Sequence, residues 1–494
     1  MAFFNYLIIA IIKKVFILFI NSNETENPKE GSQLKSTLSD KKYILLITSL
    51  SYFLCAFSVS VISIALRHIG DDFEISAVAQ TWIATIFFLS IAIFSLPFGK
   101  IAGKFGLKRT FYLGLMTLAV ASFGSFISPS VEFLIAFRAL QGLGVAILNV
   151  STLAILVESM PLSERGKGIG IITAAAYVGL VASEVIGGFL THNFGWRSIF
   201  LVVIPFLMLT AVITYLKVPN EWKFMEGSKF DYIGAAIFAA AISLFIYGLT
   251  VLNTLTGGIL VIISIVLFAL FGIWELKVKD PMYPVKILKN KGFTFASIAA
   301  ILCSFATFAV LFIVTYHLQI VKGMPTDQTG VITMLLPISM AVSTVIAGHL
   351  SDKFNPRIIA SSGLGIIFIA LVILSVLDKT TPLFVIITAI ILQGVGYGMF
   401  VSPNTNIVVS ALSSKLAPIA TATVSTTRVI GEALSLGMLT LVFAIFMGSL
   451  HLIPENSAEL ILSSQVFTIL AGIICVLAIV FSLIGVNSKN KVNS

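Results

Sequence analysis

Two basic segments of similar sequence each separate long apolar stretches. They read Gly99-Lys100-Ile101-Ala102-Gly103-Lys104-Phe105-Gly106-Leu107-Lys108-Arg109 and Gly348-His349-Leu350-Ser351-Asp352-Lys353-Phe354-Asn355-Pro356-Arg357, with a spacing of 249 residues. A second motif, Gln141-Gly142-Leu143-Gly144, returns 252 residues later as Gln393-Gly394-Val395-Gly396. Repetition at half the length of the chain predicts a duplicated bundle of membrane helices with a pathway between its two halves.

The composition of the chain is typical of an integral membrane protein. Of its 494 residues, 58% are hydrophobic and only 11% are charged, whereas a soluble domain carries about 25% charged residues. Water would not solvate such a surface, so we expect the lipid bilayer to cover most of it. The net charge of +9 then indicates basic loops on one side of the membrane, and no nucleic-acid partner is expected.

Fourteen apolar stretches are long enough to cross a bilayer as helices, which satisfy their own backbone hydrogen bonds. They begin near residues 43, 78, 110, 132, 167, 199, 231, 256, 293, 328, 358, 382, 419 and 462. The repeat aligns helices 1–6 with helices 9–14. The predicted fold is therefore all-α, with two pseudo-symmetric six-helix bundles and two inserted helices. The expected divisions are an N-terminal extension at 1–40, bundles at 41–218 and 293–487, and the inserted helices at 231–276.

The extension contains an apolar stretch, Phe3 to Ile20, with Lys13 and Lys14 at its middle. Two central lysines make it a poor membrane span, and it lacks the basic start of a signal peptide. It is either an interfacial helix or sequence upstream of the true start. The polar residues 21–40 that follow are expected to be disordered.

Lysine and arginine are unequally divided between the two sides of the predicted topology. One side holds 23 of the 31 basic residues and the other holds only Arg67, Arg197, Lys322 and Lys379. The positive-inside rule then places both termini in the cytoplasm, which requires an even number of spans. We expect a multi-pass protein of the cell membrane.

The sequence lacks the motifs of common enzymes and metal sites. Cys55, Cys303 and Cys475 are scattered through apolar stretches, and no metal-protease, phosphate-binding or hydrolase motif is present. We therefore expect neither catalytic residues nor a cofactor or bound metal, and no direct use of ATP.

Several motifs resemble the major facilitator superfamily, and specifically its fourteen-helix drug:proton antiporter branch. The resemblance covers residues 41–487 and rests on the two basic loops and on these motifs: Arg138 with Gln141-Gly142 and Gly144, Glu164-Arg165-Gly166-Lys167, Gly195-Trp196-Arg197-Ser198-Ile199-Phe200, Tyr316-His317-Leu318-Gln319 and Ser402-Pro403. It implies transport by two bundles that rock around a midplane site. It also implies a cytoplasmic gate formed by Gly99, Lys104, Gly106, Lys108, Arg109, Gly348, Asp352, Lys353 and Arg357.

The chain departs from the family pattern at four places. Gly103 stands where the first loop usually has Asp, while the second loop keeps Asp352. Ser58 occupies the place of an acidic residue in helix 1, and Arg67 replaces a proline at the end of that helix. In helix 5, Glu184 stands where the antiporter motif has proline.

Four charged residues fall well inside predicted spans, namely Arg138, Glu184, Arg428 and Glu432. A charge at the bilayer centre costs about 2.5–3.5 kcal/mol, so each of them needs a functional or structural reason. Glu184 and Glu432 lie 248 residues apart, near the repeat spacing. We hypothesise that they are counterparts facing a central cavity and that at least one exchanges protons with substrate, while Arg138 matches a family position implicated in proton transfer. The alternative is that they form structural ion pairs, Arg428 with Glu432 and Arg138 with Glu184.

Polar and aromatic side chains within the spans are candidates for lining the substrate cavity. Aromatic rings beside a carboxylate would suit lipophilic cations. The candidates are Asn149, Tyr177, Tyr316, Gln319, Tyr397 and Asn404.

The favoured function is a monomeric, proton-coupled exporter of small amphipathic compounds. The alternative is a metabolite uniporter or importer that is not coupled to protons, which the altered helix 5 motif and the missing carboxylate of helix 1 favour. A sensor or scaffold would need a sizeable soluble domain, and the sequence shows none.

Overall fold

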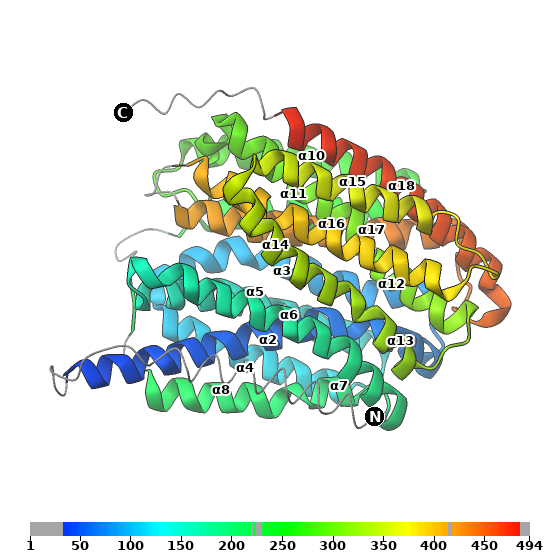
Figure 1. Cartoon of the computed structure of the whole chain (residues 1–494), viewed down its shortest axis with the longest axis horizontal. Coiled ribbons are helices and arrows are strands. Elements are labelled where there is room, and N and C mark those ends of the chain that lie inside the picture. Colours follow the sequence, from blue (N-terminus) through cyan, green and yellow to red (C-terminus); the bar gives the residue numbers. More distant parts are fainter. Residues whose placement is uncertain (1–32, 219–220, 224–229, 413–416, 485–494) are drawn as a thin grey trace.

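The computed structural model describes residues 33–218, 221–223, 230–412 and 417–484, which contain helices and no strand. Figure 1 shows the helices running along the long axis, with the first half of the chain on the lower side and the second half on the upper side. The stretch from Phe3 to Ile20 and the polar residues up to 32 lie outside the described residues, so their predicted character is untested.

Among the described residues, seven helices form the first half of the chain, and two long helices and one short one lie between it and the second half. The first half comprises α2 (Gln33–Phe73), α3 (Ala77–Phe105), α4 (Leu107–Phe126), α5 (Val131–Ser159), α6 (Leu162–Phe194), α7 (Ser198–Leu201) and α8 (Val203–Lys217). The middle comprises α9 (Tyr232–Thr250), α10 (Leu255–Lys277) and the short η1 (Val285–Lys289).

The second half has the same order of long helices. It comprises α11 (Lys291–Thr307), α12 (Val310–Tyr316), the π-helical turn η2 (His317–Val321), α13 (Thr326–Thr333), α14 (Leu335–Lys353), α15 (Pro356–Leu374), α16 (Leu383–Ser410), α17 (Ala417–Phe446), η4 (Pro454–Asn456) and α18 (Ser457–Ile484). Three of the described membrane spans are therefore divided: α7 continues into α8, α11 into α12 and η2, and α13 into α14.

The expected membrane-spanning character is confirmed. In the described part of the chain, thirteen helical segments are long and apolar enough to cross a bilayer. The remaining predicted span is α4, which has 20 residues but carries Lys108 and Arg109 in its first turn. These two charges lower its mean hydropathy, although its length of about 30 Å matches the hydrocarbon core.

Side chains at the joints define where several helices begin. A side-chain oxygen of the residue before the helix accepts a hydrogen bond from a backbone N–H of the first turn, which satisfies one of the free donors there. This cap is formed by Ser76, Ser130, Asp231, Thr254, Asn290 and Asn355. Short polar joints therefore end one apolar span and begin the next.

The helices of the two halves pair in the same way. In the first half α2 packs on α6, α5 packs on α3 and α4, and α8 packs on α2 and α4. The second half repeats these contacts with α11 on α17, α16 on α14 and α15, and α18 on α11 and α15. The halves meet through α3 with α17 and through α6 with α13 and α14, while α9 packs beside α3 and α17.

Glycines bring the paired helices into backbone contact. A Cβ added to Gly144 would lie 2.8 Å from the backbone nitrogen of Leu118, and one added to Gly396 would lie 2.8 Å from that of Ile367. Approaches this close leave no room for a side chain, as is common between membrane helices. The predicted repeat of Gly144 at Gly396 therefore has a structural counterpart in helix packing.

The joints between consecutive membrane spans lie alternately at the two ends of the molecule. We call the end with the joints α3–α4 and α14–α15 the basic end, because the two basic loops lie there. We call the other end, with the joints α2–α3 and η2–α13, the opposite end.

Glycine replacement at a close contact should destabilise the protein. A Cβ added to either Gly363 or Gly396 would lie 2.6 Å from the carbonyl oxygen of the other glycine. A Cβ added to Gly365 would meet nothing within 4 Å. We expect G363A to lower the free energy of unfolding by about 1–3 kcal/mol, the usual cost of overpacking. The measurement is thermal unfolding of the detergent-purified protein, with G365A as the matched control on the same helix; equal melting temperatures would contradict the expected close contact.

Candidate functional site

Glu184 is a fully buried carboxylate held by hydroxyl groups from both halves of the chain. It lies on α6, and its two oxygens accept hydrogen bonds of 2.7 Å from Ser60 Oγ on α2 and from Thr333 Oγ1 on α13. Among the described residues no cation forms an ion pair with it. The backbones of α6 and α13 also lie close together here, because a Cβ on Gly330 would lie 2.2 Å from the Glu184 carbonyl oxygen. Glu184 therefore connects the halves directly.

Arg138 does not form the predicted ion pair with Glu184. Its guanidinium is fully buried on α5, where Nε donates to the Ile83 carbonyl at 3.3 Å and Nη1 donates to Gln141 Oε1 at 2.9 Å. The ring of Phe87 lies 4.1 Å from its Cζ, which is favourable cation–π geometry. These partners belong to α3 and α5, so Arg138 connects helices within the first half.

Arg428 and Glu432 form the predicted ion pair on α17. Arg428 Nε lies 3.5 Å from Glu432 Oε1, as their spacing of four residues allows. The exposure is very unequal, because the arginine side chain is 53% accessible and the glutamate only 11%. Arg428 is about 17 Å from the start of α17 at 1.5 Å per residue, so this accessible surface lies in the first half of that helix and inside the span Thr423–Phe446.

Three tyrosines from both halves lie near this ion pair. Tyr52 on α2, Tyr177 on α6 and Tyr397 on α16 all lie within electrostatic range of Arg428. The Tyr177 hydroxyl lies 3.0 Å from Thr344 Oγ1 on α14, which joins the halves. The predicted cavity residues Tyr177 and Tyr397 are thus brought together with Arg428 and Glu432.

Glu184 and Glu432 differ in their spacing from a pair of equivalent glycines on the same two helices. Gly179 and Gly431 are the equivalent residues of α6 and α17, because an added Cβ on each would lie 2.4 Å from a carbonyl oxygen of the neighbouring helix, that of Phe53 or Ile301. These glycines are 252 residues apart, whereas Glu184 and Glu432 are 248 apart. The spacing of the two carboxylates therefore differs by one helical turn from that of these glycines, and their role as counterparts stays a prediction.

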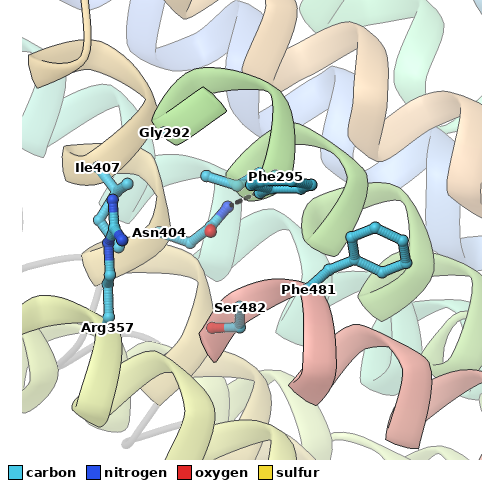
Figure 2. A pocket seen from close by; sticks show the side chains of 8 residues that line it. Gly292, Phe295, Arg357, Asn404, Ile407, Phe481 and Ser482 are labelled. Carbon is cyan, nitrogen blue, oxygen red and sulfur yellow. Dashed lines mark hydrogen bonds between the residues drawn. The ribbon is translucent and has the colours of Figure 1, made fainter. Parts of the chain in front are cut away.

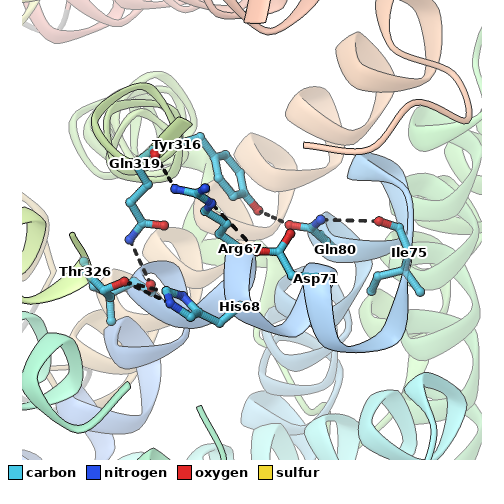
Figure 3. Close-up of polar contacts among 9 residues, drawn as sticks. Arg67, His68, Asp71, Ile75, Gln80, Tyr316, Gln319 and Thr326 are labelled. Carbon is cyan, nitrogen blue, oxygen red and sulfur yellow. Dashed lines mark hydrogen bonds and ion pairs between the residues drawn. The ribbon is translucent and has the colours of Figure 1, made fainter. Parts of the chain in front are cut away.

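Tyr316 and Gln319 belong to contacts that close the opposite end, as Figure 3 shows. Arg67 on α2 donates a hydrogen bond to the backbone carbonyl of Gln319 in η2, and Gln319 Nε2 donates in return to the Ile64 carbonyl at 3.1 Å. Asp71 lies 3.9 Å from Arg67 Nε. These reciprocal contacts bind η2 to α2 and place Gln319 in a contact between the halves.

Further contacts at the same end also join the two halves. The Tyr316 hydroxyl donates to Gln80 Oε1 at 3.5 Å, and His68 lies 3.3 Å from Thr326 Oγ1. Thr440 donates to Thr81 at 3.0 Å. With the Arg67 and Gln319 contacts, these interactions hold the opposite end closed in this conformation.

The first basic loop is fastened to a segment that follows α8. Gly106 has a φ of +116°, which suits a glycine, at the joint between α3 and α4. Glu221 accepts a hydrogen bond from the backbone of Lys108 at 2.9 Å and lies 3.7 Å from Arg109 Nε. A carboxylate at the start of α4 is favourable because the free N–H groups of a helix N-terminus attract negative charge.

The second basic loop lies beside a small pocket within the second half, shown in Figure 2. Arg357 and Asn404 line it with Gly292, and Asn404 Nδ2 donates to the Ala296 carbonyl at 3.1 Å. Phe481 contributes to the wall from α18. Asn404 therefore lines this pocket, and its predicted place in a substrate cavity stays a prediction.

The remaining predicted residues are less informative. A Cβ added to Gly99 would lie 3.9 Å from Val150 Cγ1, and one added to Gly348 would lie 3.3 Å from Ser402 Oγ. Asn149 is half-buried on α5 and Lys353 is exposed. Lys104 lies 5.7 Å from the ring of its neighbour Phe105. The side chain of Asp352 lies outside the described part of the structure, so its predicted role at the gate is untested.

Sequence analysis missed the hydrogen-bonding partners of the buried charges. Ser60 is one of several serines on α2 and Thr333 is one of three threonines on α13, 124 and 149 residues away from Glu184 in the chain. Tyr52 and Glu221 were likewise not singled out. No local sequence pattern marks such residues, since their role depends on which helices become neighbours.

A family model described as the Major Facilitator Superfamily matches residues 48–436 of the chain. The chain belongs to this superfamily. The match extends from α2 in one half to α17 in the other, and so includes most helices of both halves. The protein is accordingly a membrane transporter and not an enzyme.

Three relatives of this superfamily member are named for transport or resistance. The riboflavin transporter RibZ of Clostridioides difficile is 26% identical over 454 residues, covering 92% of this chain and 99% of its own. The multidrug resistance protein Stp of Mycobacterium tuberculosis is 26% identical, covering 82% of this chain and 76% of its own. The tetracenomycin C resistance and export protein of Streptomyces glaucescens is 25% identical, with coverages of 84% and 78%.

Solved transporter structures share the fold of this superfamily member. A bacterial homologue of the human lysosomal transporter Spinster, in an inward-facing and unoccupied conformation, matches with a TM-score of 0.66 and 18% identity over 90% of this chain and 97% of that one. A D-xylose-proton symporter matches with a TM-score of 0.63 and 15% identity, with coverages of 89% and 97%. At these identities the similarity concerns the fold alone.

Loss of the Arg67 contact should open the opposite end. The reporter is a cysteine at Thr440, which is fully buried at the contact between the halves. We expect R67Q to increase the labelling rate of T440C by a membrane-impermeant maleimide about tenfold, because a hydrogen bond from a charged group is worth about 1.5–3 kcal/mol. The native cysteines are all buried, and variants without T440C correct for them.

The matched control is R197Q at the same end of the molecule. Arg197 pairs with Asp72 at 2.7 Å and donates to the Ser128 carbonyl, so its partners lie within the first half. Labelling in R197Q should equal that of the parent. Equal labelling in R67Q and R197Q would show that Arg67 does not hold the halves together.

Proposed function

We propose that the protein is a monomeric, proton-coupled secondary transporter that exports small amphipathic compounds by alternating access. The proposal takes residues 41–218 and 293–487 as the two moving bundles and α9 and α10 as an insert. It also takes the basic end as the cytoplasmic one in the cell membrane, because 23 of 31 basic residues lie on that side. Both termini are then cytoplasmic.

The observation that carries proton coupling is the position of Glu184 between the halves. When ionised, its carboxylate accepts hydrogen bonds from Ser60 of the first half and Thr333 of the second. Protonation turns one oxygen into a donor and removes the charge that strengthens both bonds. The proton on Glu184 therefore changes how strongly α2 and α6 are bound to α13.

This change is placed where it can alter access to the centre of the protein. Glu184 lies about 15 Å from the end of α6 at the opposite end, and its partner Ser60 is on the same helix as Arg67. In the conformation described, the contacts of Arg67 and Thr440 join the halves at the opposite end while Arg428 is 53% accessible. Protonation from the opposite side would weaken one of the bonds that keep that end closed.

Glu184 is a better candidate for the coupling group than the other buried charges. Glu432 already has Arg428 as a partner at 3.5 Å, which stabilises its ionised form. Arg138 is bound inside the first half by Gln141 and Ile83. We therefore assign proton exchange to Glu184 and place Arg428 and Glu432 at the substrate site.

The direction of transport is supported by two of the relatives. The names of the Mycobacterium and Streptomyces proteins refer to multidrug resistance and to tetracenomycin C resistance and export. The cluster of Tyr52, Tyr177 and Tyr397 offers aromatic surface beside charged groups, which suits amphipathic molecules.

Transport of a metabolite without proton coupling is the second candidate. It is favoured by RibZ, which matches over 99% of its own length. It is also favoured by Ser58, which stands where the family often has a carboxylate and whose buried hydroxyl has no hydrogen-bond partner among the described residues. In this case transport would follow the substrate gradient alone.

Replacing Glu184 by glutamine should remove the dependence of transport on a pH gradient. If one proton exchanges for one substrate, a gradient of one pH unit supports about a tenfold concentration ratio, because 1.4 kcal/mol corresponds to a factor of ten. We expect everted vesicles with E184Q to lose this gradient-driven dye accumulation, while exchange of labelled for unlabelled dye persists.

Two variants control for this experiment. Glu158 is an exposed carboxylate on α5, and E158Q should accumulate dye like the wild type. E432Q should weaken dye exchange itself, with or without a gradient, because it leaves Arg428 unpaired at the proposed substrate site. Undiminished gradient-driven accumulation in E184Q would refute proton exchange at Glu184, and wild-type flux that ignores the gradient would support the second candidate.

A further inference from the structure

In the ion pair of Arg428 and Glu432, the positive side chain is much more exposed than the negative one. Arg428 is 53% exposed while the carboxylate of Glu432 is only 11% exposed. The close contact between them uses Arg428 Nε, and a guanidinium has four more N–H groups on its two terminal nitrogens. A molecule that reaches this site therefore contacts the Arg428 guanidinium, which has further N–H donors, while the carboxylate of Glu432 is largely covered.

Aromatic rings from both halves complete the surroundings of Arg428. Tyr52 and Tyr177 come from the first half and Tyr397 from the second, and all three lie within electrostatic range of the guanidinium. Tyrosine combines an apolar ring with a polar tip. Tyr177 is half-buried, and its hydroxyl is already engaged by Thr344 at 3.0 Å. The ring of Tyr177 is therefore held in place across the boundary between the halves.

We propose that this site selects aromatic compounds that carry a carboxylate or another anionic edge, with Arg428 binding the anion and the tyrosines packing against the ring. This inference rests on the proposed function, because it takes the space around Arg428 as the substrate site. A guanidinium binds a carboxylate through two parallel N–H···O bonds, which fixes the orientation of the ligand as well as its charge.

A cationic substrate is disfavoured by the same geometry. It would face the like charge of Arg428 and would reach Glu432 only by displacing that arginine from a partner four residues away on its own helix. The expectation that a carboxylate beside aromatic rings binds lipophilic cations is therefore reversed at this site, because the carboxylate is covered and the arginine is not.

Two probes that share the same aromatic ring system but carry opposite charges test the proposal. They are anthracene-2-carboxylate and 2-(aminomethyl)anthracene, and their equilibrium binding to the purified full-length protein is measured by fluorescence anisotropy without any pH gradient. We expect the wild type to bind the carboxylate at least about tenfold more tightly than the amine, the discrimination expected of a charge-assisted hydrogen bond.

Three variants locate the preference at Arg428. R428K should keep part of the preference, because it retains the charge without the planar fork. R428Q/E432Q removes both charges together and avoids an unpaired buried carboxylate, and it should bind the two probes equally. R197Q, at the opposite end, should bind like the wild type. Thermal unfolding of each variant checks that it is folded.

The outcomes are distinct from those that test proton coupling. A wild-type protein that prefers the amine, with the preference lost in E432Q, would overturn the proposal and make Glu432 the ligand-binding group. An unchanged carboxylate preference in R428Q/E432Q would also overturn it. Failure of Glu184 to couple protons would leave the binding preference at Arg428 intact, since no gradient is present in this measurement.

Discussion

Backbone contact at glycines is the constraint on which the rest of this structure depends. Gly179 brings α6 against α2, and Gly431 brings α17 against α11, each so closely that an added Cβ would lie 2.4 Å from a carbonyl oxygen. Helices in a bilayer gain little from burying apolar side chains against one another, because lipid is equally apolar. Close backbone packing instead fixes the register of each pair, and so fixes the height of every charged group on these helices.

The two halves share this scaffold but use it for different chemistry. On α6 the buried carboxylate of Glu184 lies in the contact between halves and is bound only by hydroxyls among the described residues. On α17 Glu432 lies one turn away from the equivalent height and carries its own counter-ion, Arg428. An uncompensated carboxylate at a moving boundary suits proton exchange, whereas an ion pair beside three tyrosines suits recognition of a substrate. In our proposal the two tasks are therefore divided between the halves.

The ends of the molecule are unequal in a similar way. The opposite end is joined across the halves by Arg67 with Gln319 and by Thr440 with Thr81. At the basic end, Glu221 beside the first basic loop follows α8, and Lys100 of that loop donates to the carbonyls of Asp280 and Pro281 after α10. Gly292 beside the second loop belongs to the second half. None of these contacts joins the first bundle to the second. The conformation thus combines a closed opposite end with an accessible Arg428.

The sequence by itself determined the membrane spans, the repeat of helix pairs and the Arg428–Glu432 ion pair. These features depend on hydropathy, on glycine spacing and on contacts within one helix, all of which are local. Only the tertiary structure decided that Glu184 meets Ser60 and Thr333 rather than Arg138, that Gln319 and Tyr316 join the halves at one end, and that Asn404 and Arg357 line one pocket. The reason is physical: lipid-facing and protein-facing surfaces are both apolar, so hydrophobic periodicity does not reveal which face of a helix points inward, and partners more than a hundred residues apart are set by packing alone.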